Sequence, residues 1–225
     1  NADLSNSNLS NADLSSSNLS NVNLSRAQVT GVNLTSATLF VANLEAVNLA
    51  TANMTSVSSG GVIGSPALPT SWKLIKGYLV GSYANLSRAN LVGANLDGAN
   101  FAQATLDGAD LTNATLVGAT LDGVNLSNAK LKNVSSGGII GRPTLDSPWQ
   151  VQNGYLVGPE ANLAGANFGN ADLSRSTLTG VISGGVTGAR LLPDSWRLIA
   201  GYLVGPGANL TGAQLQQANL AGVRS

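Results

Sequence analysis

The sequence predicts an all-β solenoid, in which short parallel strands follow one another around an axis and successive coils stack. Two observations lead to this fold. Large apolar residues recur five positions apart along most of the chain, beginning with Leu4, Leu9 and Leu14. Three long segments that share Gly-Gly, Trp and Gly-Tyr-Leu-Val-Gly interrupt the pattern, which then resumes. A period of five fits neither a helix, which repeats near 3.6 residues, nor a flat strand, which repeats at 2.

Each unit of five residues predicts one side of a coil. A small residue stands two positions before each large one, and Asn, Asp or Thr stands between them in most units. This alternation predicts a very short strand with two side chains inward and one outward. The two remaining residues must turn a corner, because the next unit again directs its large residue inward. The large residues run from Leu4 to Met54, Leu86 to Leu131, Leu163 to Leu178 and Leu210 to Leu220.

The units resemble a known family. "NADLS" and "GANLDGANFAQATLDGADLTNATL" are similar to the repeat A-(N/D)-L-x-x of pentapeptide-repeat proteins. The resemblance implies a right-handed quadrilateral parallel β-helix, whereas the spacing alone also allows three sides. Four sides give coils of 20 residues, hence about eleven coils for this chain. We expect one solenoid domain over residues 1–225.

The three interrupting segments predict one module used three times. We call them module 1 (about 58–83), module 2 (about 135–160) and module 3 (about 182–207). In module 1, Met54 and Leu86 are 32 residues apart. We interpret this as one coil's length of chain, a resumed period of five, and two extra residues. Each module is therefore expected to be a distorted coil rather than a linker between domains.

An aromatic pair marks each module. An indole does not fit a slot that holds Ala or Val in neighbouring coils, so we expect each Trp to cap the distortion from outside or at a corner. Counting four faces puts Trp72 and Trp196 on one face and Trp149 on an adjacent face. The aromatic residues either seal an insertion, which is the favoured interpretation, or form a repeated interaction patch. The patch would comprise Trp72, Tyr78, Trp149, Tyr155, Trp196 and Tyr202.

The composition argues against an enzyme. The 225 residues include no Cys and no His, so the commonest nucleophile, general base and transition-metal ligands are missing. We expect no catalytic, cofactor-binding or metal-binding residues. Asp107 and Asp110 are interpreted as solvated corner residues, and the Gly-rich stretches as backbone turns rather than phosphate loops. No apolar run approaches the length of a transmembrane helix.

The favoured function is a non-enzymatic rod that presents flat faces to a protein partner or to itself. One alternative is a DNA-mimicking inhibitor or protector of a type II topoisomerase, an activity that the resemblance implies for some members. Eleven acidic and eleven basic residues balance, which counts against such mimicry and makes nucleic acid an unexpected partner. A second alternative is an ice-binding or carbohydrate-binding surface, the latter built on the Trp and Tyr residues.

The compartment is not fixed by the sequence. Low charge, the lack of Cys and many Ser, Thr and Asn residues favour an exported bacterial protein. Neither end of the chain resembles a solenoid cap, so we expect either further flanking chain or end-to-end self-association.

Overall fold

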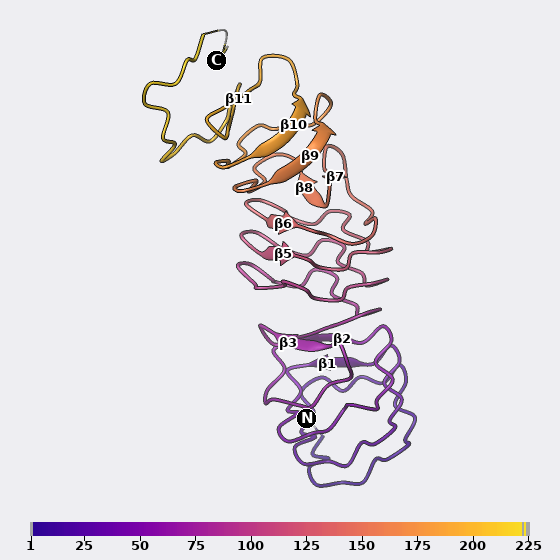
Figure 1. Ribbon diagram of the computed structural model, residues 1–225. Coiled ribbons are helices and arrows are strands. Elements are labelled where there is room, and N and C mark those ends of the chain that lie inside the picture. The colour runs from indigo at the N-terminus through magenta and orange to yellow at the C-terminus, as the bar shows by residue number, and fades with distance from the viewer. Residues whose placement is uncertain (1, 222, 224–225) are drawn as a thin grey trace.

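The computed structural model describes residues 2–221 and 223, and this part of the chain is all-β. Its coils stack along one axis in chain order (Figure 1). Parallel bridges join residues 20 apart, as in the series Asp3, Asn23 and Asn43. Corresponding ladders start at Asn8, Asp13 and Asn18, so each ordinary coil contributes to four of them.

Most coil sides are single bridges, and only the longer pairings count as strands. Their shortness follows from the sequence, because each unit has one outward residue before the next corner. The strands are β1 (Thr38–Phe40), β2 (Ser58–Gly60), β3 (Lys73–Ile75), β4 (Tyr78–Val80), β5 (Thr115–Val117), β6 (Ser135–Gly137), β7 (Gln150–Gln152), β8 (Tyr155–Val157), β9 (Asn167–Asp172), β10 (Thr187–Leu191), β11 (Arg197–Ile199) and β12 (Tyr202–Val204). No helix in the described residues is long and apolar enough to cross a membrane.

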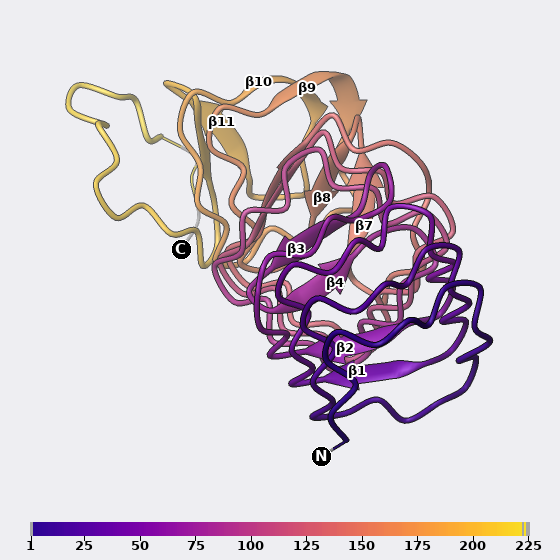
Figure 2. The same cartoon turned by 90° about the horizontal axis from the view of Figure 1, so that it is seen from below.

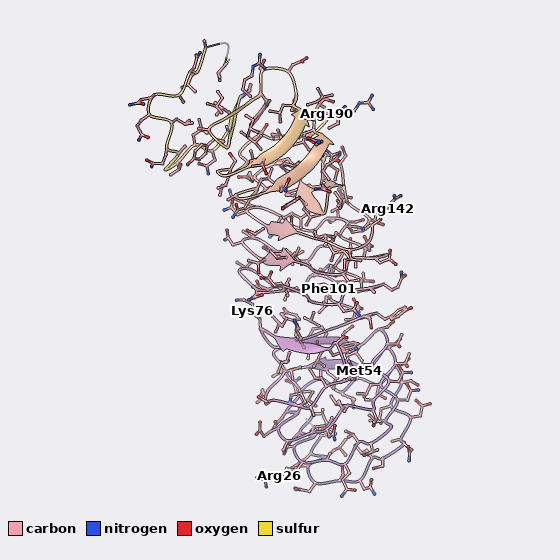
Figure 3. All side chains as sticks on the ribbon, viewed as in Figure 1. Arg26, Met54, Lys76, Phe101, Arg142 and Arg190 are labelled. Carbon is pink, nitrogen blue, oxygen red and sulfur yellow. The ribbon has the colours of Figure 1, made fainter. Side chains whose placement is uncertain are left out.

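The core is a column of small and large side chains. Ala37 and Leu39 of one side and Ala42 and Leu44 of the next are completely buried, as the alternation predicts. In Figure 3 the labelled Phe101 lies inside the stack, whereas the labelled arginines lie at its periphery. Burial of each Leu contributes about 1.5–3 kcal/mol, so the column is the main source of stability.

The corners explain the preference for Asn and Asp at the outward position. The Asp3 Oδ1 accepts a hydrogen bond from the Ser5 N–H at 2.9 Å, and many later units repeat this Asx turn. The next residue then takes a positive φ, as at Asn6 (58°) and Gly31 (67°). Asn and Gly tolerate that conformation better than other residues, so the residues of each unit favour the turn at its corner.

The modules are longer than an ordinary coil by seven residues. Parallel bridges join Ser58 to Asn85, Ser135 to Asn162 and Ile182 to Asn209, each spanning 27 residues. The extra chain forms an antiparallel β-hairpin, β3–β4, β7–β8 or β11–β12. Viewed from below, β3 and β4 lie within the outline of the coils (Figure 2).

The expected count of residues in the modules was therefore wrong. Leu74 and Leu79 are five apart because they face each other across the two-residue hairpin turn, not because the repeat resumes. Asn85 then lies above Ser58, one corner earlier than predicted.

This difference also overturns the predicted arrangement of the tryptophans. Module 1 begins on the ladder that contains Ser58 and Asn85. Counted in steps of five residues from Asn85, Ser135 lies two ladders away from it, and module 2 begins there. Ile182, where module 3 begins, belongs to the same ladder as Ser135. Modules 2 and 3 therefore begin on the same side of the solenoid, and module 1 begins on the opposite side. Around the axis, Trp149 therefore has the position that corresponds to Trp196, whereas the prediction had placed Trp72 and Trp196 on one face.

Modules 1 and 2 divide the core into three segments. Leu79 packs with the core below module 1, whereas Val80 packs with the core above it. Leu156 and Val157 divide the next two core segments in the same way. Beyond module 3 the chain leaves the stack in both views, and Leu220 is exposed there (Figures 1 and 2).

The hairpin turns give a stability prediction. Both turn residues have positive φ in all three modules, the geometry for which Asn-Gly is preferred. Module 2 has Asn153, but module 3 has the exposed Ala200 at φ 47°. We expect Ala200→Asn to raise the free energy of unfolding by up to about 1 kcal/mol in urea denaturation. The matched Asn153→Ala should lower it; an unchanged or lower stability for Ala200→Asn would contradict the assignment.

Candidate functional site

A buried serine anchors each hairpin to the coil below it. The Ser59 Oγ accepts a hydrogen bond from the Leu79 N–H at 2.8 Å, and Ser136 and Ser183 do the same in modules 2 and 3. Ser59 stands where Leu39 stands one coil earlier. The smaller side chain leaves room for Leu79, which is completely buried.

The tryptophans cover the glycine that follows each hairpin. A Cβ on Gly81 would lie 2.1 Å from Cδ2 of Trp72, and one on Gly158 would lie 2.4 Å from Cδ2 of Trp149. Trp72 packs against the core segments on both sides of module 1. Trp196 is buried against the last core segment, and Trp149, like Trp72, is half-buried.

The tyrosines attach each hairpin to the coil above. The Tyr78 hydroxyl oxygen accepts a hydrogen bond from the Asn90 N–H at 3.0 Å. Tyr155 and Tyr202 make the equivalent contact 12 residues further along. All six aromatic residues of the predicted patch therefore have packing or hydrogen-bonding partners in their module or in the neighbouring coils. The three modules repeat the same arrangement rather than bringing all six together.

Exposed apolar side chains lie beside the first two modules. Phe40 and Ile63 are 45% and 52% exposed next to module 1, and we call them apolar patch 1. Val117 and Ile140, at 50% and 60%, occupy the equivalent positions next to module 2 and form apolar patch 2. These four residues were not predicted as a surface feature. Ile63 and Ile140 stand at the outward position, which usually holds a polar side chain, and Phe40 and Val117 stand at the corner that follows a large inward residue.

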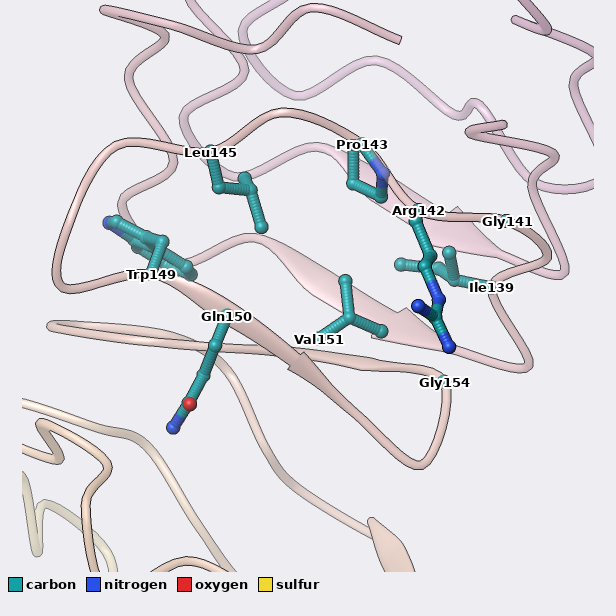
Figure 4. A pocket seen from close by; sticks show the side chains of 9 residues that line it. All are labelled: Ile139, Gly141, Arg142, Pro143, Leu145, Trp149, Gln150, Val151 and Gly154. Carbon is teal, nitrogen blue, oxygen red and sulfur yellow. The ribbon is translucent and has the colours of Figure 1, made fainter. Parts of the chain in front are cut away.

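Two open hollows are lined in part by strand β7 of module 2. The larger, of about 570 Å³, lies between the loop that begins at Gly141 and strand β7. Leu145, Pro143 and Val151 line it, with Trp149 at one end and Arg142 reaching across it (Figure 4).

The second hollow, of about 420 Å³, shares Gln150 with the lining of the first. Its lining is polar. It is lined by Gln150, Gln152, Asp172, Ser174 and Arg175.

Several aspartates serve the corners and not one another. Hydrogen bonds from the side chain and the backbone of Thr112 hold the pKa of Asp110 below its ordinary value, and Lys130 assists. The Asp107 Oδ1 instead accepts a hydrogen bond from the Asn128 side chain. Hydrogen bonds from the residue two positions on likewise lower the pKa of Asp3, Asp13 and Asp172. Within the described residues, no three potential metal ligands cluster together.

The contact between Gly158 and Trp149 predicts a steric effect. Gly158→Ala should displace the indole, lower the free energy of unfolding by about 1–3 kcal/mol and shift tryptophan emission to the red. Gly98→Asn is the control, because nothing lies within 4 Å of an added Cβ and its φ of 60° suits Asn. Unchanged emission and stability in Gly158→Ala would contradict the packing.

The aspartates predict the acid sensitivity of the fold. A lowered pKa in the folded state means that these carboxylates add stability above their unfolded pKa and lose it as the pH falls through the folded value. With no His in the chain, melting temperature should change little from about pH 5 to 8 and fall below about pH 4. Replacing Asp3, Asp13, Asp110 and Asp172 by Asn, which keeps the Oδ1 acceptor, should weaken this fall.

Comparisons with known proteins agree with this architecture. A family model described as pentapeptide repeats matches eight copies, over residues 1–35, 84–123, 101–135 and 160–182. No curated protein sequence matches the chain.

Solved structures of pentapeptide-repeat proteins are among the matches. Rfr23 from the cyanobacterium Cyanothece 51142 is 30% identical over 55% of this chain, with a TM-score of 0.26, and the chain spans 63% of its length. HetL from Nostoc sp. strain PCC 7120, involved in heterocyst differentiation regulation, is 24% identical over 85% of this chain and 87% of its own, with a TM-score of 0.34. QnrB1, a plasmid-mediated fluoroquinolone resistance protein, is 18% identical over 61% and 79%, with a TM-score of 0.25.

One explanation accounts for the eight matched repeats, for the parallel bridges between residues 20 apart and for the inward Ala and Leu side chains of successive units: the chain belongs to the pentapeptide-repeat family.

Proposed function

We propose that this chain is a non-enzymatic scaffold, a single β-helical domain over residues 1–225 that presents its sides to a protein partner. The observation that carries the proposal is that outward aspartate side chains form hydrogen bonds within the corners of the coils. Asp3, Asp13 and Asp110 accept hydrogen bonds from their own corners, and their lowered pKa keeps them ionised near neutral pH. A carboxylate of this kind is a poor general acid, because that role requires a proton and a raised pKa.

The two apolar patches support docking of a partner at the sides of the rod. Apolar patch 1 combines Phe40, the last residue of β1, with Ile63, which follows β2. Apolar patch 2 combines Val117, the last residue of β5, with Ile140, which follows β6. Phe40 stands where most units of the first stretch hold Ser or Thr, and Ile63 stands where Asn43 stands one coil earlier. These exposed side chains add apolar area without serving the core, and exposed apolar area favours contact with another protein.

The test compares partner capture by patch variants. The wild type and the variants Phe40→Ser with Ile63→Ser, Val117→Ser with Ile140→Ser, and the control Val92→Ser would each be cross-linked in cells and purified. We expect one or more proteins to be captured by the wild type and the control, and lost from at least one patch variant with unchanged melting temperature. Capture that is equal in all four proteins would overturn the role of the patches.

Two further measurements separate the alternatives. Sedimentation of the purified chain over a range of concentrations tests self-association, in which case the captured partner is a second copy. A DNA supercoiling assay with gyrase tests topoisomerase inhibition, for which we expect no effect because acidic and basic residues balance. Inhibition that tracks the purified protein would replace the scaffold proposal.

A further inference from the structure

Modules 1 and 2 have the same backbone arrangement but differ in several side chains. Residues of module 2 and its following coil lie 77 positions after their counterparts in module 1. Strand β3 faces the next coil with Lys73 and Ile75, whereas β7 has Gln150 and Gln152 at these positions. Ile75 packs against the apolar core, so sealing the module does not require an amide there.

The coil that follows module 2 also has polar side chains where the coil that follows module 1 has Ala and Gly. Ser176 occupies an inward position that holds Ala99 after module 1, and it is only 6% exposed. Arg175 replaces Gly98 at the adjacent corner. Around this hollow, polar side chains thus replace Ile75, Gly98 and Ala99 of module 1 and its following coil. The counterparts of the other lining residues, Lys73, Asn95 and Asp97, are polar in both places.

Hydrogen bonds hold the wall of this hollow in place. The Gln150 Nε2 donates to the buried Ser176 Oγ, which satisfies that hydroxyl. The Gln152 Nε2 donates to the Gln150 Oε1 at 3.3 Å. On the opposite wall the Asp172 Oδ1 accepts from the Ser174 N–H at 2.9 Å. The amides and the carboxylate are therefore oriented before any ligand arrives, which reduces the entropic cost of binding.

We propose that the hollow lined by Gln150, Gln152, Asp172, Ser174 and Arg175 is a binding site for a sugar residue. One carboxylate and one guanidinium leave the lining without net charge, and together with the amides they offer both donors and acceptors. A neutral ring with several hydroxyl groups matches this set, because each hydroxyl both donates and accepts.

The larger hollow shares one residue with this site. Gln150 belongs to the lining of both hollows, and Trp149 lies at the end of the larger one (Figure 4). An oligosaccharide could place one residue among the polar side chains and a second beside the indole and Val151. Aromatic rings with an apolar face suit the C–H face of a sugar. This role goes beyond the scaffold function and does not depend on it.

The test is a titration followed by NMR signals of the site. The probes are glucose, galactose, mannose, N-acetylglucosamine and maltotriose, added to the full chain. We expect saturable shifts of the Gln150 and Gln152 side-chain amides, with a Kd on the order of 1 mM for the sugar that fits. The Trp149 indole signal should move only with the trisaccharide. No saturable shift with any of these sugars would overturn the proposal.

A module exchange supplies the matched variant. Gln150→Lys, Gln152→Ile and Ser176→Ala together install the residues of module 1, which that backbone already accommodates. We expect an unchanged melting temperature and affinity weakened by at least about tenfold. Lys73→Gln in module 1 is the control and should leave binding unchanged.

Two other results would also overturn the sugar site. One is affinity retained in the exchanged variant. The other is saturable binding of glycine or glutamate without binding of any sugar, which would assign Asp172 and Arg175 to a zwitterion instead.

Discussion

The backbone ladder between successive coils is the constraint on which the rest of the structure depends. The Leu4 N–H donates to the Asn23 carbonyl oxygen, and the Asn23 N–H donates to the Ala2 carbonyl oxygen, at 2.8 and 3.0 Å. Nearly all strand pairing is therefore between coils, so neighbouring coils must have matching paths. A segment with extra residues must either break the ladder or satisfy its surplus backbone groups itself. The modules do the latter, because the antiparallel hairpin supplies bonds of its own while Ser58 still pairs with Asn85.

The ordinary coils were predictable from the sequence because each unit carries its whole structure. The inward, corner and outward residues all follow from the five positions of a unit, and Ala94, Leu96, Ala99 and Phe101 are buried as the pattern predicts. The hairpins were not predicted, because the spacing of Leu74 and Leu79 imitates the repeat. Asn153-Gly154 between alternating residues was the available signal for a hairpin turn, and a repeat of five left no place for it.

The site was predictable only in part, for a related reason. Trp and Tyr stand out in a chain of Ala, Asn and Leu, and one of their modules, module 2, lines both hollows. The polar lining combines Gln150 and Gln152 with Asp172 and Arg175, which belong to a later unit and look like ordinary corner residues there. Only the stacking of one coil above the hairpin brings the two groups together. Comparing module 2 with module 1 residue by residue would have drawn attention to the glutamines, since a sealing strand has no need of them.

The modules also give the solenoid a property that uniform repeats lack. In an uninterrupted column each coil meets equivalent neighbours, and no position differs from another along the axis. A hairpin places one apolar side chain in each adjoining core segment, as Leu156 and Val157 do, and turns its outer side chains toward the next coil. Those outer positions take no part in the ladder between coils, and the core accepts different side chains there, since Ile75 packs against it where module 2 has Gln152. Side-chain chemistry can therefore vary there without cost to the fold, and Gln150 and Gln152 occupy two such positions.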